Sequence, residues 1–147
     1  MKVLLQRVRR AEVRVGGEQV AGIGAGLLVF IGIEAGDTAE EAEFQADRTA
    51  GLRIFEDDGG RMNLSLRDTG GEALVVSQFT LAGSTRRGRR PSFDGAESPE
   101  RAELLYGLYV RALREQGIRV ATGRFREMME VELVNDGPVT FLLDPRR

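Results

Sequence analysis

The sequence predicts an α+β fold, in which a mainly antiparallel, barrel-like sheet carries two packed helices in a single domain over residues 1–147. Three observations support this prediction. Most apolar runs are short or alternate with polar residues, which is the pattern of strands. Two stretches begin with helix start signals and continue with helical spacing. A length of 147 residues suits one domain with a substantial hydrophobic core.

The first part of the chain contains four candidate strands. Residues 1–8 alternate loosely between apolar and polar side chains. Residues 11–15 and 19–23 flank Gly16-Gly17, which is a glycine-rich hairpin signal. Residues 27–33 are wholly apolar, as expected for a strand that is buried on both faces.

Two helices are expected. Asp37 and Glu40 have the spacing of a capping box, so a helix should follow to about Leu52. Ser98 is a suitable N-cap for the second helix, and Pro99 then occupies its first position. Apolar residues follow at helical spacing and form one stripe for burial, namely Ala102, Leu105, Tyr106, Tyr109, Val110 and Leu113.

A long loop over residues 81–97 carries a cluster of positive charge and lacks secondary-structure signals. Loops of this length in a compact domain are often functional. Arginine suits phosphate oxygens, so the loop is a candidate phosphate-binding segment, although a solvated surface loop is the usual outcome for such a charge run. Pro91 should stiffen it and Phe93 can anchor it. Its arginines are Arg86, Arg87, Arg89 and Arg90.

The C-terminal segment predicts a hairpin around residues 135–140, with sequence Asn-Asp-Gly-Pro-Val-Thr, between alternating runs at 127–134 and 139–143. Proline is unusual there because it cannot donate to a strand ladder. A trans peptide at Gly137-Pro138 is favoured by base rate, since only about 5–6% of such bonds are cis. The alternative is a cis bond that directs two backbone carbonyls toward a ligand.

The composition excludes several classes of chemistry. The chain has no cysteine and no histidine, so disulfides, thiol catalysis, a Ser-His-Asp triad and imidazole metal sites are ruled out. No loop has the ligand spacing of a carboxylate metal site, and no cofactor is expected. The formal net charge of −2 does not indicate general nucleic-acid binding. No segment resembles a signal peptide or a membrane span, so we expect a cytoplasmic protein.

A strand is predicted over residues 72–80 and ends in Ser77-Gln78-Phe79-Thr80, where a loop begins. The simplest interpretation is a strand end whose hydroxyls satisfy local backbone groups. The functional interpretation is that strand-end amides and a hydroxyl stabilise a developing oxyanion. Thr80 is a poor nucleophile, because a threonine hydroxyl needs a neighbouring base and no carboxylate lies near it in sequence. Backbone N–H groups are the better candidates.

These motifs together resemble the D-aminoacyl-tRNA deacylase family, over essentially the whole chain. Two segments are highly specific and occur in the expected order. The resemblance rests on residues 6–8, 53–55, 62–64, 77–82, 90–93 and 135–140.

The resemblance implies a homodimer that hydrolyses the ester between a D-amino acid and the 3′ end of tRNA, with no membrane or DNA partner. It implies that Gly137-Pro138 is cis and reaches from one subunit into the pocket of the other, with Arg7 helping to hold it. Ser77 to Thr80 fall on the active-site segment of the family. Met129 also fits the family pattern, as a residue that contacts substrate.

One departure from the family pattern follows Gly123-Arg124-Phe125. Small residues usually come next, whereas this chain has Arg126 and Glu127, so the pocket wall near Phe125 is expected to differ.

The chemistry that the resemblance implies is consistent with the composition. An aminoacyl ester is already activated, so positioning, amide donors and the 2′-hydroxyl of the terminal adenosine can supply the catalysis. Rigid carbonyls at Gly137-Pro138 would exclude an L side chain. Glycine has no side chain to exclude, so glycyl-tRNA should also be cleaved.

Two other functions remain open from the residues alone. The first is a non-enzymatic RNA-binding module that uses the arginine-rich loop. The second is a hydrolase for another ester or a peptide, which would ignore uncharged tRNA as a competitor.

Overall fold

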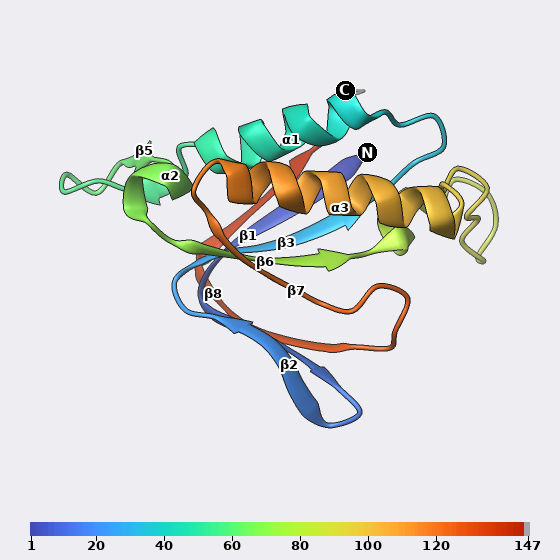
Figure 1. The fold of residues 1–147 in the computed structure, drawn as a ribbon, viewed down its shortest axis with the longest axis horizontal. Coiled ribbons are helices and arrows are strands. Elements are labelled where there is room, and N and C mark those ends of the chain that lie inside the picture. Colours follow the sequence, from blue (N-terminus) through green and yellow to red (C-terminus); the bar gives the residue numbers. More distant parts are fainter. Residues whose placement is uncertain (146–147) are drawn as a thin grey trace.

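The computed structural model describes residues 1–145, which form an α+β arrangement of one curved sheet and its covering helices. Helices α1 (Ala39–Gly51) and α3 (Pro99–Glu115) lie side by side across one face of the sheet (Figure 1). A short third helix, α2 (Leu66–Thr69), was not expected from the sequence. A capping box between Ser65 and Asp68 begins it.

The main sheet is mixed, because antiparallel pairs are combined with parallel ones, so the prediction of a mainly antiparallel sheet is confirmed only in part. Its strands run in the order β2 (Glu18–Ile23), β1 (Lys2–Val15), β3 (Gly26–Gly32), β6 (Glu72–Ser77) and β7 (Arg119–Thr122). The β3–β6 and β6–β7 pairs are parallel. Each of these connections passes through a helix, which returns the chain to the same end of the sheet.

Strand β1 is one continuous strand where the sequence suggested two. Its first half pairs with β3, its second half pairs with β2, and β8 (Glu130–Leu143) pairs along its other edge. The Gly16-Gly17 hairpin between β1 and β2 is confirmed. A separate small hairpin joins β4 (Phe55–Glu56) to β5 (Met62–Leu64).

The predicted hairpin at residues 135–140 is wrong, because this segment lies inside the single strand β8. Residues 140–143 pair with the start of β1, and residues 130–135 pair with its second half. Residues 136–139 therefore stand opposite Arg7 alone and form a bulge between two paired stretches. The chain continues along β1 past this point and does not reverse direction.

The start of α1 also differs from the prediction. Thr38 is the N-cap, and its hydroxyl accepts a hydrogen bond from the Glu41 amide. Asp37 instead faces the Met1 ammonium, with its carboxylate oxygen 2.7 Å from the nitrogen. A long-range ion pair therefore occupies the side chain that the local spacing assigned to the cap.

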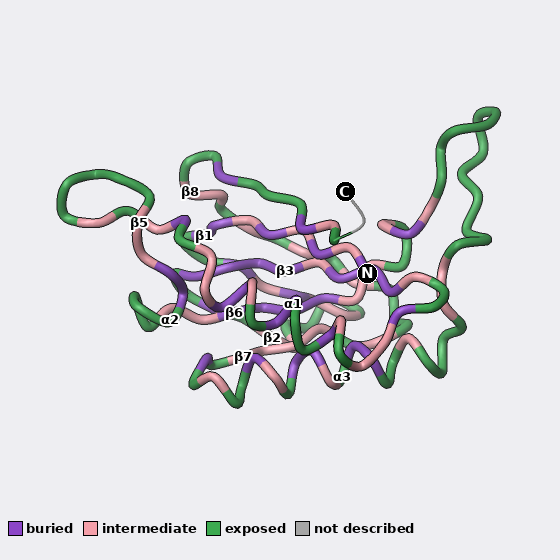
Figure 2. Tube along the Cα trace, turned by 90° about the horizontal axis from the view of Figure 1, so that it is seen from above, coloured by how far each residue is buried: buried purple, intermediate pink, exposed green. Residues whose placement is uncertain are grey.

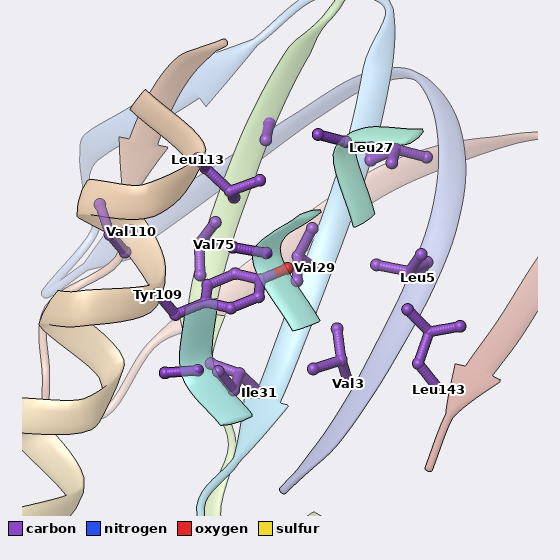
Figure 3. Packing of buried hydrophobic residues seen from close by; sticks show 14 of the residues in the cluster. Val3, Leu5, Leu27, Val29, Ile31, Val75, Tyr109, Val110, Leu113 and Leu143 are labelled. Atoms are coloured by element: carbon purple, nitrogen blue, oxygen red, sulfur yellow. The ribbon is translucent and has the colours of Figure 1, made fainter. Parts of the chain in front are cut away.

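The main core lies between the helices and the sheet (Figure 3). The predicted stripe of α3 is confirmed, because Tyr109 and Leu113 are fully buried against Val29, Ile31 and Val75 of the sheet. The Tyr109 hydroxyl is satisfied by Thr49 of α1 at 2.7 Å. A second apolar cluster lies against the other part of the curved sheet and includes Val13, Leu28 and Leu74.

Among the strands, burial is concentrated in β1, β3 and β6, and it is lost at the loops (Figure 2). The long segment between η1, a 3₁₀ helix over Phe79–Ala82, and α3 extends away from the body and is exposed over most of its length (Figure 2). Among residues 1–145, no helix combines the length and the apolar character needed to cross a bilayer.

Candidate active site

A cavity of about 490 Å³ opens where β6 ends, a volume typical of small-molecule sites. Its wall is built from four segments that are distant in the sequence. They are Ile33 after β3, the end of β6 with η1 (Val76, Ser77, Gln78, Phe79), the loop before α3 with the start of that helix (Ala96, Glu97, Pro99, Ala102) and the turn before β8 (residues 125–129 with Val131).

Aromatic packing fixes the inner wall of this cavity. The rings of Tyr106 and Phe125 lie 5.8 Å apart, and the Tyr106 hydroxyl donates to the Val75 carbonyl at 2.9 Å. Burial raises the pKa of Tyr106 to about 12, so the hydroxyl stays protonated and acts as a donor. Met129 comes close to Gly123, where an added Cβ would lie 2.8 Å from its sulfur. Glycine at 123 therefore gives Met129 the room to line the cavity.

The Ser77–Thr80 segment, which borders the cavity through Ser77, Gln78 and Phe79, contains two main-chain donors without an acceptor. Strand β6 ends at Ser77 and η1 begins at Phe79. Within the described part of the chain, the amides of Phe79 and Thr80 donate to no acceptor, whereas those of Gln78 and Leu81 donate to Ile31 and Gln78 carbonyls. Free N–H groups at the end of a strand can stabilise an oxyanion.

Thr80 itself lies outside the cavity wall and is exposed. Its hydroxyl oxygen accepts a hydrogen bond from the side-chain nitrogen Nε2 of Gln78, which is a donor and not a base. The geometry therefore gives the Thr80 hydroxyl no activating partner among the described residues.

The arginine-rich loop is attached to this segment through an aromatic contact. The rings of Phe79 and Phe93 lie 5.2 Å apart, so the expected anchoring by Phe93 is confirmed. Two backbone hydrogen bonds of 2.7 and 2.9 Å between Ser84 and Ser92 close the base of the loop. Arg86, Arg87, Arg89 and Arg90 are all exposed between these two serines and do not line the cavity.

The bulge in β8 is held from both sides. The buried Arg7 donates to the carbonyls of Asp136 and Ile54, each at 2.8 Å. At the start of the bulge, the Asn135 side chain accepts a hydrogen bond from the Val139 amide at 2.7 Å and donates one to the Val139 carbonyl at 3.2 Å. The hydrogen bonds at Asp136 and at Val139 therefore hold the chain on either side of Gly137-Pro138.

Gly137-Pro138 is cis and exposed at the tip of this bulge. An added Cβ at Gly137 would lie 2.6 Å from Val139 Cγ2, and its φ of 153° also favours glycine. In this chain, Arg7, Gly137 and Pro138 do not line the cavity. The structure thus separates the predicted site residues into two groups, with Ser77, Gln78, Phe79 and Met129 at the cavity and the Arg7 group at the bulge.

Several cavity residues were not predicted as site residues. Pro99 and Ala102 carried only a helix-start and a core signal, and Ala96 and Glu97 lay in an irregular loop. Phe125, Arg126 and Glu127 stood out only through the departure from the family pattern. Met128, which is 90% exposed at the rim, carried no signal.

The model of the D-Tyr-tRNA(Tyr) deacylase family matches residues 4–144. The chain belongs to this family. A D-aminoacyl-tRNA deacylase of Thermodesulfovibrio yellowstonii is 53% identical over 146 residues, which cover 99% of this chain and 100% of that protein. One of Anaeromyxobacter dehalogenans is 55% identical over 147 residues, which cover 100% of this chain and 99% of that protein.

Solved structures support the deacylase fold. A structure described as c-Myc DNA unwinding element binding protein has a TM-score of 0.92 and 41% identity, and the alignment covers 98% of each chain. A probable eukaryotic D-amino acid tRNA deacylase has a TM-score of 0.83 over 97% of each chain, and at 20% identity it supports the fold alone.

Proposed function

We propose that this protein hydrolyses the ester of D-aminoacyl-tRNA in the cytoplasm and releases the free amino acid and tRNA. The observation that carries the proposal is the cavity at the end of β6, beside two main-chain amides that are free to donate. The chain that forms this cavity belongs to the D-Tyr-tRNA(Tyr) deacylase family, and it has no histidine or cysteine to serve as base or nucleophile.

The reaction is direct attack of water on the ester carbonyl. The amides of Phe79 and Thr80 donate to the oxygen as it gains negative charge. The bond from the carbonyl carbon to the 3′ oxygen then breaks, and that oxygen takes up a proton. The neighbouring 2′-hydroxyl of the RNA supplies the polar group that orients the water, so no side-chain base is needed.

Chiral selection uses Gly137-Pro138 of a second copy of the chain. The motif is exposed and lies apart from its own cavity wall, so a homodimer is needed to bring it to a cavity. There, the two carbonyls occupy the volume of an L side chain. A D side chain points elsewhere and glycine has none, so both D-aminoacyl-tRNA and glycyl-tRNA are substrates.

The arginine-rich loop holds the RNA. Its four exposed arginines can contact phosphates, and the Phe79–Phe93 contact links their loop to the catalytic segment. RNA bound by the loop is thereby placed near the cavity.

The deciding experiment compares deacylation of matched D-tyrosyl-, L-tyrosyl- and glycyl-tRNA under single-turnover conditions. Rapid release from the D and glycyl substrates is expected, with the L substrate at least about 100-fold slower. If glycyl-tRNA survives while D-tyrosyl-tRNA is hydrolysed, the steric account of selection is wrong. Thr80→Ala should retain activity within about fivefold, because no base activates this hydroxyl. Complete loss in a folded Thr80→Ala protein would contradict the main-chain mechanism.

A second candidate function is a nucleic-acid-binding module without catalysis. The exposed arginine-rich loop favours it, because such a loop would contact any phosphate backbone. The same assay separates the two functions. A pure binder would retain uncharged tRNA and leave all three esters intact.

A further inference from the structure

We propose that Arg126 forms a phosphate-binding subsite at the mouth of the cavity and holds a phosphodiester of the RNA acceptor end. The inference rests on the proposed function, because it concerns how that same cavity holds its RNA substrate. The Arg126 subsite would be a phosphate contact separate from the RNA contacts proposed for the arginine-rich loop.

The backbone at Arg126 is the first observation. Its φ is +68°, and among residues 1–145 it is the only non-glycine residue in the left-handed region. A Cβ disfavours that region, so glycine would be the easier choice in this turn. Backbone conformations of this kind cluster at active sites and ligand-binding segments. The left-handed turn places an arginine on the cavity wall.

The charges around the cavity are the second observation. Three charged residues line it, namely Glu97, Arg126 and Glu127. The Glu97 carboxylate lies 3.4 Å from the Arg101 guanidinium and also accepts from the Ser98 amide at 2.9 Å. Glu127 lies 4.0 Å from Arg124.

Both acids are therefore compensated by arginines outside the cavity wall. Arg126 forms no ion pair within the described part of the chain, and its side chain is exposed. Its guanidinium is the charge at this mouth that remains available to a ligand.

The chemistry of the substrate identifies that ligand. In an aminoacyl ester the carboxylate of the amino acid is consumed, and its amino group is cationic. The anions near the ester are the phosphodiesters of the RNA, of which the nearest lies on the 5′ side of the terminal adenosine. A guanidinium fork matches phosphate oxygens in two parallel hydrogen bonds. Arg126 lines the same cavity as Ser77 and Phe79. When the ester is bound in that cavity, the phosphodiester on the 5′ side of the terminal adenosine is therefore within reach of the Arg126 guanidinium.

The test compares two substrates, D-tyrosyl-tRNA and a D-tyrosyl ester of adenosine that carries no phosphate. Arg126→Gly removes the charge and suits the left-handed backbone, so the fold should be preserved. We expect the ratio of kcat/KM for the tRNA to kcat/KM for the nucleoside ester to fall about tenfold, mainly through KM. The slope of log kcat/KM against log salt should decrease by about 0.7, the value for one phosphate on a single strand.

Two control variants isolate the contact. Arg126→Lys keeps the charge and should keep the salt slope. Arg111→Ala removes the same charge from the exposed face of α3, where Arg111 pairs with Glu115 at 3.0 Å, and should leave the ratio unaltered. An unchanged ratio in Arg126→Gly would overturn the proposal, as would an equal fall in Arg111→Ala or a reduced slope in Arg126→Lys.

The outcome also separates this inference from the proposed function. If the wild-type protein hydrolyses neither substrate, the proposed function itself fails. If the wild-type protein hydrolyses both substrates and the ratio of the two kcat/KM values is the same in Arg126→Gly, only the proposal of a phosphate subsite fails.

Discussion

Asp37 joins two distant parts of the chain at one carboxylate. Its oxygen lies 2.7 Å from the Met1 ammonium, and both side chains are fully buried. The same carboxylate accepts from the Glu34 amide at 2.7 Å. Burial alone would raise the pKa of Asp37, but the hydrogen bonds from the ammonium and the amide lower it overall.

Asp37→Asn should destabilise the protein by about 3 kcal/mol, because it leaves a buried ammonium without its main counter-charge. Urea unfolding at pH 7 measures the change in the free energy of unfolding. Asp47→Asn is a matched control, since Asp47 is exposed and pairs with Arg67 at 3.5 Å, and its effect should stay within about 0.5 kcal/mol. Equal losses in the two variants would contradict the assigned role of Asp37.

The lowered pKa also fixes the pH dependence. The ionised carboxylate stabilises the fold above the unfolded-state pKa of about 3.9, and this contribution is lost as pH falls through the lower folded-state pKa. The acid side of the stability curve should therefore be flatter in Asp37→Asn. The sequence could not reveal this role, because local spacing points to a helix cap and the partner is 36 residues away.

At the scale of elements, one glycine permits the close pairing of β3 with β6. An added Cβ at Gly26 would lie 1.8 Å from the Glu72 carbonyl oxygen. That contact is with backbone, so no side-chain rotation can relieve it. The parallel β3–β6 register, which leads to the cavity at the end of β6, begins at this pair.

Gly26→Ala should therefore cost at least about 3 kcal/mol, through a shift of the two strands. Gly107→Ala is the control, because nothing lies within 4 Å of an added Cβ at this helical position. It should stabilise the protein by about 0.5–1 kcal/mol. Thermal unfolding of both variants checks the opposite signs, and a neutral Gly26→Ala would show that the strands can separate easily.

Elements defined by local signals were predicted well, and those defined by pairing partners were not. The α3 stripe, the Gly16-Gly17 turn and strand β6 each carry their signal within a few residues, although β6 ends at Ser77 and not at residue 80 as predicted. The Asp136-Gly137 signal is the same in a hairpin and in a bulge. The difference lies in β1, which pairs with the chain on both sides of the motif. The capping box of α2 is also a local signal, but the helix that it begins is only 4 residues long.

At the scale of the whole molecule, the cavity and the Gly137-Pro138 bulge belong to different regions of one chain. The sequence identified both groups through their motifs, but no local pattern reports whether one subunit or two must supply them. The cavity wall also depends on the packing of α3 and the turn before β8, which bring four distant segments together.

Mixed dimers should show whether the bulge acts on the other subunit. Pro138→Ala should allow L-tyrosyl-tRNA hydrolysis, and Ala96→Trp should fill the cavity that Ala96 lines. In a purified dimer of one Pro138→Ala and one Ala96→Trp chain, the open cavity receives an intact Pro138 from its partner. Rejection of the L substrate should therefore return while D-tyrosyl-tRNA is still cleaved.

The two homodimers serve as controls, being unselective and inactive respectively. If the mixed dimer still hydrolyses L-tyrosyl-tRNA, the motif acts within its own chain and the cross-subunit account is wrong. A protein that sediments as a monomer at assay concentrations would lead to the same conclusion.

If the unpaired amides of Phe79 and Thr80 are the donors proposed above, they have a consequence for how this enzyme tolerates mutation. Every amino acid except proline carries the same N–H group, so exchanging a side chain at these positions cannot delete the donor. Inactivating substitutions should then arise chiefly by altering backbone course or fold stability. Selection on such a catalyst acts on its backbone conformation more than on the identity of its side chains.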